Sequence, residues 1–373
     1  MPQLMNRLNT TRIYLDSDSK TLFLLSARCR LNGKPLLRVL SGERIDPVPV
    51  WMMRQAGRHL PEYRETRAKA RDFLHFCYSP ALAAEATLQP VRRYGMDGAI
   101  LFADILLVLD AMGRNVRFLE GEGPRVDPAR KASDLGKVQI EKVLAHLSPV
   151  AETVERVKAA LDPNVTLIGF AGSPWTVGVY AIEGRGGTDK ADSRVFGYQH
   201  PAELDGMLDQ LVEASAHYLK MQADAGADAL MLFESWAEGL PEDAFDNWVI
   251  GPTKKLVQRM RALGVNQPIL GFPRGAGMLV LDYAERTGVN AVGLDTAIPL
   301  TRMNMALPKG MAVQGNLDPM RLVAGGPGLE TRVGEIIGAL KGRPHIFNLG
   351  HGVTPETPIS HVESTLRAIR SFV

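Results

Sequence analysis

The amino-acid sequence predicts a single (β/α)8 barrel, the TIM-barrel class of α/β fold, preceded by an N-terminal extension. From Val48 onward, short apolar runs alternate with longer amphipathic stretches, which is the pattern of βα units around a parallel sheet. Eight such runs are present, and no stretch rich in Pro, Gly or Ser divides them. The length of 373 residues fits one domain, because such barrels commonly reach about 250 residues or more.

Each apolar run predicts one strand of the barrel. The runs, in order, are residues 48–53, 98–102, 165–170, 229–233, 268–272, 291–294, 311–314 and 345–349. Apolar residues recur at helical spacing between them, for example after Ser148-Pro149 and before Gly226. Ser148-Pro149 is a good cap and first-turn pair, so we expect a helix to begin there. The connections between the runs at 268, 291 and 311 leave room for short helices only.

Charge separates an N-terminal extension, residues 1–36, from the barrel, residues 37–373. The extension holds six basic and two acidic residues, whereas the barrel holds 37 basic and 39 acidic ones. The overall net charge of +2 and pI of about 8.5 therefore reflect the extension, and they do not indicate nucleic-acid binding. Asp16 and Asp18 argue against a transit peptide, so we interpret the extension as disordered or as a start codon placed too early.

Composition and missing motifs narrow the function further. Two cysteines, Cys29 and Cys77, predict neither a disulfide framework nor a Cys-rich metal site, and they favour the cytoplasm. No apolar run reaches 18 residues, and the most apolar region, 99–109, is interrupted by Asp104. The nucleotide and zinc motifs GxGxxG in a strand-to-helix context, GxxxxGK[ST] and HExxH are absent. We therefore expect an enzyme without cofactor or metal, and without a membrane or nucleic-acid partner.

Polar residues follow the predicted strands at the end where barrels of this class carry their active sites. Arg54, Asp104, Ser235, Arg274 and His351 all lie directly after, or within two residues of, an apolar run. Loops are solvated, so a polar residue at a single strand end is unremarkable in itself. Solvation explains Arg54, Asp104 and His351 less well, because each follows a run that is expected to be buried.

The densest positive segment of the barrel spans residues 54–71, with six basic and two acidic residues. Arg54 and Arg58 flank Gln55, Ala56 and Gly57, where glycine permits close approach and amide groups can meet an anion. The guanidinium fork can also pair both oxygens of a carboxylate. We expect Arg54 and Arg58 to bind carboxylates or phosphates. A solvated helix face is the preferred interpretation for three later residues, Arg64, Lys69 and Arg71.

Asp104 is a single carboxylate in very apolar surroundings, so it needs donors or a cationic partner. One interpretation is a structural salt bridge to Arg54 or Arg58. The other is an acceptor for ligand N–H groups that also stabilises positive charge in a transition state. His351, between two glycines, is equally consistent with a ring bonded to the loop backbone and with a ligand contact or proton donor.

Two further side chains have a less specific pattern. The segment 169–176, which leads to Tyr180, has the glycine and proline content of a shaped loop, although spacing alone favours core packing for Trp175 and Tyr180. Ser235 lacks the flanking glycines of a nucleophile elbow, so a hydrogen-bonding role is expected.

Five segments resemble the uroporphyrinogen decarboxylase family. Residues 49–67, Pro-Val-Trp-Met-Met-Arg-Gln-Ala-Gly-Arg-His-Leu-Pro-Glu-Tyr-Arg-Glu-Thr-Arg, are similar to its first signature, and residues 169–176 with Tyr180 are similar to its second. Matches also occur at 100–106, 232–236 and 348–352, in the family's order. The resemblance begins at about Leu37. One departure is His59, where the family usually has Tyr.

The resemblance implies a homodimeric (β/α)8 barrel that removes carbon dioxide from the four acetates of uroporphyrinogen III without a cofactor, giving coproporphyrinogen III. It implies that Asp104 accepts the pyrrole N–H groups and stabilises the transition state. Catalytic roles are also implied for Arg54, Arg58, Tyr180 and His351. Substrate contacts are implied for Arg54, Gln55, Ala56, Gly57, Arg58, Asp104, Tyr180, Ser235 and His351, with Arg67 as a further candidate.

Three questions stay open at the level of sequence. The general acid is one: an arginine is a costly proton donor, while His351 and Tyr180 titrate more easily. A second question is whether the chain is instead a related barrel methyltransferase for corrinoid-bound methyl groups. That family needs His and Cys zinc ligands towards the C-terminus, and no cysteine follows Cys77, which argues against it. A third is a catalytically silent tetrapyrrole-binding protein, against which the complete Arg, Asp, Tyr and His set argues.

Overall fold

The computed structural model describes residues 33–119, 121–136 and 138–372. From Lys34 onward the chain forms one unit, which begins three residues before the boundary at Leu37 that the sequence suggested. The ammonium group of Lys34 donates to Asp228 at 2.5 Å and to the carbonyl of Val165 at 2.8 Å, and Leu36 is fully buried. The expectation of a disordered extension concerns residues 1–32 for the most part, and these lie outside the described residues.

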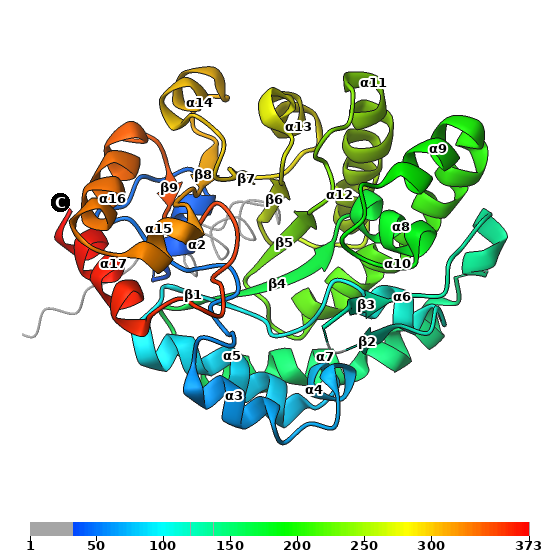
Figure 1. Ribbon diagram of the computed structural model, residues 1–373, viewed down its shortest axis with the longest axis horizontal. Helices are drawn as coiled ribbons and strands as arrows, with labels where there is room; N and C mark the ends of the chain where they lie inside the picture. The colour runs from blue at the N-terminus through cyan, green and yellow to red at the C-terminus, as the bar shows by residue number, and fades with distance from the viewer. Residues whose placement is uncertain (1–32, 120, 137, 373) are drawn as a thin grey trace, which may run out of the picture. The chain divides into compact units, whose positions relative to one another are not determined.

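A curled sheet of seven parallel strands lies at the centre of this unit (Figure 1). Its strands, in spatial order, are β1 (Gly98–Ile100), β4 (Thr166–Gly172), β5 (Ala229–Glu234), β6 (Ile269–Pro273), β7 (Ala291–Gly293), β8 (Ala312–Gln314) and β9 (His345–Ile346). Neighbouring strands are parallel throughout. Seven of the eight predicted runs are therefore strands, in the predicted order.

The remaining run, residues 48–53, is the first along the chain, and we call it the Val50 segment. It forms a single parallel bridge between Val50 and Phe347 rather than a strand. On one side, Phe347 donates to the carbonyl of Pro49 at 2.8 Å. On the other side, Asp97 donates to the carbonyl of Val50 at 2.9 Å, and the Asp97 carboxylate accepts from the Val50 amide at 2.7 Å. The segment therefore bonds to both edges of the sheet. No ladder forms toward β1, because a side-chain oxygen takes the place of a backbone acceptor.

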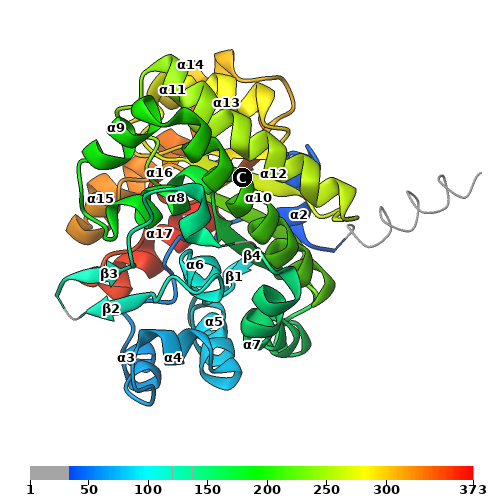
Figure 2. The same cartoon turned by 90° about the vertical axis from the view of Figure 1, so that its right-hand side faces the viewer.

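Helices surround the sheet (Figures 1 and 2). The longer ones are α5 (Pro80–Tyr94), α7 (Ile140–Ala160), α10 (Pro201–Asp224), α12 (Gly251–Ala262), α16 (Pro327–Ala339) and α17 (Ile359–Ser371). In α10 the buried residues Leu204, Leu208, Leu211, Ser215, Tyr218 and Gln222 repeat every three or four positions, as predicted. The short helices expected before β7 and β8 are α13 (Val280–Arg286) and α14 (Leu300–Ala306).

The predicted start of a helix at Ser148-Pro149 is wrong, because α7 begins at Ile140 and Pro149 lies inside it. Val143, Leu147 and Val150 are all buried, so the apolar stripe continues across the proline. Proline removes one backbone N–H from a helix, and the packing of a continuous buried face outweighs that loss here.

Shorter elements fill the connections. They are α2 (Pro35–Leu40), α3 (Pro61–Arg67), α4 (Phe73–Cys77), α6 (Leu107–Ala111), the antiparallel pair β2 (Arg117–Leu119) and β3 (Gly123–Arg125), η1 (Ala132–Leu135), α8 (Pro174–Glu183), α9 (Ala191–Gln199), α11 (Glu242–Phe245), the π-helix η2 (Asp246–Ile250), η3 (Gly277–Leu279) and α15 (Pro319–Ala324). Among the described helices, none is both long enough and apolar enough to cross a bilayer.

Candidate active site

The candidate residues gather at the carboxyl rim of the sheet, where parallel strands all end on one side. Arg54 follows the Val50 segment, Asp104 follows β1, Tyr180 lies on α8 after β4, Ser235 follows β5, and His351 follows β9. The charges of Asp104, Tyr180, Arg274 and Arg58 all influence the pKa of Arg54. Residues as far apart in the sequence as Arg54 and Arg274 therefore share one electrostatic environment.

Arg54 is held in an unusual backbone conformation, with φ at 59°. The preceding amide, of Met53, donates to the side-chain oxygen of Asn348 at 2.9 Å, and the Met53 carbonyl accepts from Val353 at 2.9 Å. The Arg54 stem lies so close to Gly352 that a Cβ there would overlap it. The loop after β9, residues 347–353, which we call the β9 loop, therefore supports the left-handed backbone conformation of Arg54, which a non-glycine residue rarely adopts.

Between Arg54 and Arg58, in the segment 54–58 that we call the arginine loop, Gln55 is hydrogen-bonded to the fold, whereas the backbone amides of Ala56 and Gly57 are not, as far as the described residues go. The Gln55 side chain points inward, accepts from Met52 at 3.0 Å and donates to the carbonyl of Gly98 at 3.0 Å, and its own amide also bonds to Met52. Gln55 therefore fastens the loop to β1. The amides of Ala56 and Gly57 have no hydrogen-bond partner within the described residues. Their expected role as anion contacts stays a prediction.

Arg54 and Arg58 have guanidinium groups without hydrogen bonds or ion pairs inside the described part of the chain, and both residues are exposed. Arg67 differs, because it donates to the carbonyl of Ala70 at 3.2 Å and lies 5.9 Å from the centre of the Phe76 ring. Arg67 is thus engaged at the end of α3, and its candidacy as a carboxylate partner stays untested.

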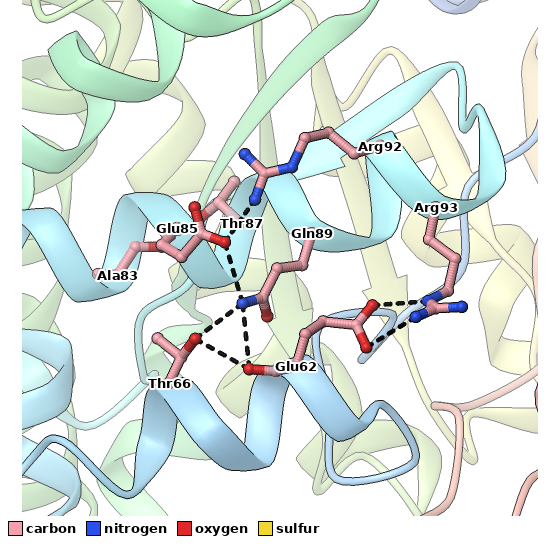
Figure 3. A network of polar contacts seen from close by, with 8 residues as sticks. All are labelled: Glu62, Thr66, Ala83, Glu85, Thr87, Gln89, Arg92 and Arg93. Atoms are coloured by element: carbon pink, nitrogen blue, oxygen red, sulfur yellow. Dashed lines mark hydrogen bonds and ion pairs between the residues drawn. The ribbon is translucent and has the colours of Figure 1, made fainter.

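Helix α3, which follows the arginine loop, is fixed to α5 by a polar network (Figure 3). Gln89 on α5 donates to the Thr66 hydroxyl at 2.8 Å and to the carbonyl of Glu62 at 3.2 Å. Arg93 pairs with both carboxylate oxygens of Glu62, at 2.6 and 3.0 Å. Also on α5, the Thr87 hydroxyl accepts from the amide of Phe102, two residues before Asp104. One helix therefore positions both the arginine loop and the strand end that carries the carboxylate.

Asp104 is half-buried, and one of its oxygens accepts from the amide of Leu106 at 2.8 Å. Burial raises the pKa of Asp104 to about 6, against the opposing effects of the Leu106 bond and the charge of Arg54. Neither Arg54 nor Arg58 forms a salt bridge with Asp104 within the residues described. The structural salt bridge considered for Asp104 is therefore not formed, and the carboxylate can accept from a ligand.

Tyr180 and Trp175 lie on the same helix but have different environments. Trp175 is fully buried and donates to the carbonyl of Trp236 at 3.1 Å, which confirms the expected core packing. Tyr180 is only half-buried, edge-to-face with the Trp236 ring at 5.8 Å, so core packing was the wrong expectation for it. Burial raises the pKa of Tyr180, as does the nearby charge of Asp104, and its hydroxyl stays protonated at neutral pH.

The ring of His351 has no hydrogen-bond partner among the described residues, so the interpretation as a histidine bonded to its loop backbone does not hold. Burial, together with the positive charges of Arg54 and Arg274, lowers the pKa of His351 to about 4. The imidazole is therefore uncharged at neutral pH in the free protein.

Ser235 is held through its backbone, which donates to the Thr176 hydroxyl at 2.8 Å. Behind it lies Glu234, a fully buried carboxylate that contacts the Thr176 hydroxyl and accepts from the amide of Trp236 at 3.4 Å. Burial raises the pKa of Glu234 to about 7. Sequence reasoning missed this residue as a support of the site, because a carboxylate at a strand end is ordinarily solvated.

Arg274 lies directly after β6, and the sequence placed it at a strand end without assigning it a role. Its guanidinium donates to the carbonyl of Ser235 at 3.5 Å and lies 3.9 Å from the carboxylate of Glu238. The available signal was the same as for Arg54, a charged residue immediately after an apolar run. No cluster of three or more His, Cys, Asp or Glu side chains suited to a metal ion occurs in the part of the chain that is described.

By their chemistry, these groups are suited to a ligand with several anionic groups and several N–H donors. Arg54, Arg58 and Arg274 supply positive charge, and Asp104 supplies an acceptor. Tyr180 and His351 add a phenol and a neutral imidazole, which can donate hydrogen bonds or exchange protons.

Comparisons with known proteins identify the family of the chain. The family model of uroporphyrinogen decarboxylase (URO-D) matches residues 32–372. A uroporphyrinogen decarboxylase from Hyphomonas neptunium is 60% identical over 338 residues, 91% of this chain and 98% of that protein. One from Maricaulis maris is 52% identical over 342 residues, again 91% and 98%.

Among solved structures, a methyltransferase from Methanosarcina mazei is similar, with a TM-score of 0.75 and 20% sequence identity, over 90% of this chain and 97% of that one. At this identity the likeness concerns the fold alone. The match of the family model over residues 32–372, together with relatives at 52–60% identity, shows that the chain belongs to the uroporphyrinogen decarboxylase family.

Proposed function

We propose that this protein converts the four acetate side chains of uroporphyrinogen III to methyl groups, releasing four molecules of carbon dioxide and giving coproporphyrinogen III. The observation that carries the proposal is the convergence of Asp104, Arg54, Tyr180 and His351 on one rim, in a chain of this family. Relatives named for this activity match along 91% of the chain.

The substrate suits the site on chemical grounds. A porphyrinogen presents four pyrrole N–H donors that can converge on one carboxylate, and Asp104 is a carboxylate without a salt-bridge partner in the residues described. The eight peripheral carboxylates of the substrate require cations, which Arg54 and Arg58 provide. The free amides of Ala56 and Gly57 add donors for the same groups.

The protein has to supply only proton transfers and charge stabilisation for this reaction, because the ring itself accepts the electron pair of the bond that breaks. A pyrrole carbon takes up a proton, and the ring becomes an electron sink. The bond between the acetate CH2 and its carboxylate then breaks, its electron pair moves into the ring, and carbon dioxide leaves. A second proton adds to the exocyclic carbon to give the methyl group, the first is lost, and the pyrrole is restored. Ionised Asp104 stabilises the positive charge that the first protonation creates.

The first proton has two candidate donors. Tyr180 carries its proton at neutral pH, because its pKa is raised. His351 is neutral in the free protein, since Arg54 and Arg274 add to the effect of burial on its pKa. Substrate carboxylates offset these two charges on binding, which opposes the lowering of the pKa of His351 and favours a protonated imidazole that can donate.

The proposal includes a closed barrel, a homodimer and the cytoplasm as its compartment. Closure is supported by the Val50 segment, which bonds to the Phe347 segment on one side and to Asp97 on the other. Light scattering of the purified protein tests the dimer, and a single monomeric mass would contradict it.

The decisive experiment is incubation of the purified protein with uroporphyrinogen III without oxygen, followed by separation of the porphyrins after oxidation. We expect hepta-, hexa-, penta- and tetracarboxylate products. Binding of the substrate without release of carbon dioxide would identify a silent tetrapyrrole-binding protein instead. Stoichiometric zinc in the purified protein, with no decarboxylation, would favour the methyltransferase alternative.

A further inference from the structure

We infer that Arg274 is an additional substrate-binding residue, which holds a peripheral carboxylate of the tetrapyrrole, and that Glu238 is the counter-ion that this carboxylate displaces. The inference rests on the proposed function and deepens it. It assigns a cation from the β6 end of the rim, in addition to Arg54 and Arg58 of the arginine loop.

The backbone of Arg274 is fixed at the rim. Its amide donates to the carbonyl of Glu234 at 2.9 Å, across the β5–β6 pair. The next amide, of Gly275, donates to the carboxylate of Asp295 at 2.7 Å, which ties the loop to the end of β7. The side chain reaches toward Ser235, whose carbonyl accepts from it at 3.5 Å. Arg274 therefore stands beside a predicted substrate contact on a rigid support.

The charge at this position is poorly balanced in the free protein. The positive charge of Arg274 lowers the pKa of both Arg54 and His351, so it acts in the same space as they do. Its one ion pair in the described residues is with Glu238, at 3.9 Å, and the two side chains are 36% and 60% exposed. A long pair between exposed groups contributes little to stability, so a ligand carboxylate displaces it easily.

The backbone of Glu238 is held by neighbouring residues, whereas its carboxylate makes only the long ion pair with Arg274 among the described residues. Its carbonyl accepts from the buried ammonium group of Lys190 at 3.2 Å. A Cβ at Gly275 would lie 2.6 Å from the Cβ of Glu238, so the two loops are in close contact. The carboxylate is therefore kept near Arg274 without being locked onto it, as a displaceable counter-ion requires.

Opposite effects of two substitutions test the inference. Arg274→Gln is expected to raise KM for uroporphyrinogen III about tenfold or more, with kcat changed less than about threefold, because a charge-assisted contact to the substrate is lost. Arg274→Lys keeps the positive charge but loses the two-pronged guanidinium, and its KM is expected to lie between those of the wild-type protein and Arg274→Gln. Glu238→Gln is expected to lower KM, most clearly at low ionic strength, since the competing carboxylate is gone.

The pair Arg332 and Glu335 on α16 provides the matched control, at 2.9 Å with side chains 35% and 56% exposed. Arg332→Gln is expected to leave KM unchanged. A KM for Arg274→Gln within twofold of the wild-type value would overturn the inference, and so would an increase in KM for Glu238→Gln. Should Arg274→Gln fail to fold, as judged by circular dichroism, Arg274→Lys and Glu238→Gln decide the matter.

Binding of two oxidised porphyrins, measured by fluorescence quenching, separates the inference from the proposed function. Loss of uroporphyrin binding in Arg274→Gln, with an inactive wild-type protein, would support Arg274 and reject the decarboxylase. Normal wild-type turnover with uroporphyrin binding unaffected by Arg274→Gln would reject Arg274 alone. An equal loss of coproporphyrin binding would assign the bound carboxylate to a propionate, and a loss confined to uroporphyrin would assign it to an acetate.

Discussion

At the scale of single residues, the chemistry of the site depends on how much each charged side chain is removed from water. Asp104 illustrates this, because burial raises its pKa to about 6 while the same acid in water has a pKa near 3.8. The carboxylate is still ionised at neutral pH, so it can accept N–H groups and stabilise a cation.

Asp104→Asn is therefore expected to reduce turnover of uroporphyrinogen III more than tenfold. The amide has nearly the same shape but no charge to stabilise the pyrrolic cation. Steady-state kinetics check this, together with circular dichroism to show that the fold is kept. Turnover near the wild-type rate would remove Asp104 from the mechanism.

The pH dependence of the wild-type protein is a second prediction at this scale. The ionised form of Asp104 is the active one, and the pKa of the free protein is about 6, so kcat/KM is expected to fall as the pH drops below about 6. A pH profile from 5 to 8 measures this limb. A profile that stays flat down to pH 5 would contradict the raised pKa or the requirement for the anion.

The same shift has a consequence for stability. The folded-state pKa of Asp104 lies above its unfolded value, so its favourable contribution is fully present below pH 3.8 and is lost as the pH rises through about 6. Asp104→Asn cannot ionise and is expected to melt at a higher temperature than wild type at pH 8, with the difference shrinking at pH 4. Thermal melts at both pH values measure it, and a variant less stable at pH 8 would refute the sign.

At the scale of elements, the β9 loop holds the arginine loop in place. Asn348 is fully buried, and its side-chain oxygen accepts from the amides of Met53 at 2.9 Å and of Leu349 at 2.7 Å. Met53 immediately precedes the left-handed position of Arg54. Asn348 is thus a positioning residue that acts through Arg54.

Asn348→Leu is expected to lower kcat/KM more than tenfold, because two buried amides lose their acceptor, at a cost of about 1–3 kcal/mol each, and Arg54 loses its position. Asn348→Asp keeps an oxygen at the same place and is expected to retain more activity than the leucine variant. Kinetics and thermal melts on both variants check this. Equal activity of the two, in folded protein, would show that the contact to Met53 does not position Arg54.

At the scale of the whole molecule, the limits of the folded unit decide which truncation is tolerated. Lys34 pairs with Asp228 at 2.5 Å, and Leu36 is fully buried, so the last residues of the predicted extension belong to the folded unit. Deletion of residues 1–32 is expected to lower the pI and to leave turnover within about twofold of wild type.

Deletion of residues 1–36 is expected to lower the melting temperature, since it removes a buried leucine worth about 1.5–3 kcal/mol as well as the Lys34 contact. Comparing the melts and turnover of the two truncated proteins measures the difference. Loss of activity in a folded protein that lacks only residues 1–32 would show that the extension takes part in function.

The order of the sheet and the rim position of most candidate residues could be predicted from sequence. Apolar runs separated by amphipathic stretches determine strand order, and strand order determines which residues follow a strand end. For the same reason Arg54, Asp104 and His351 stood out without any knowledge of distance. The missing ladder between the segment 48–53 and β1 could not be predicted, because it depends on the carboxylate of Asp97, 47 residues from Val50, taking the place of a backbone acceptor.

By itself, then, the sequence determined an α/β chain with parallel strands in a known order, a positive segment around Arg54, and a carboxylate in apolar surroundings. Only the tertiary structure decided that Asp104 forms no salt bridge with any described residue, that Tyr180 is half-buried, and that the charge of Arg274 acts on both Arg54 and His351. The physical reason is that pairing, burial and pKa depend on distances in space. Those distances arise when strands 50 to 300 residues apart end on one rim.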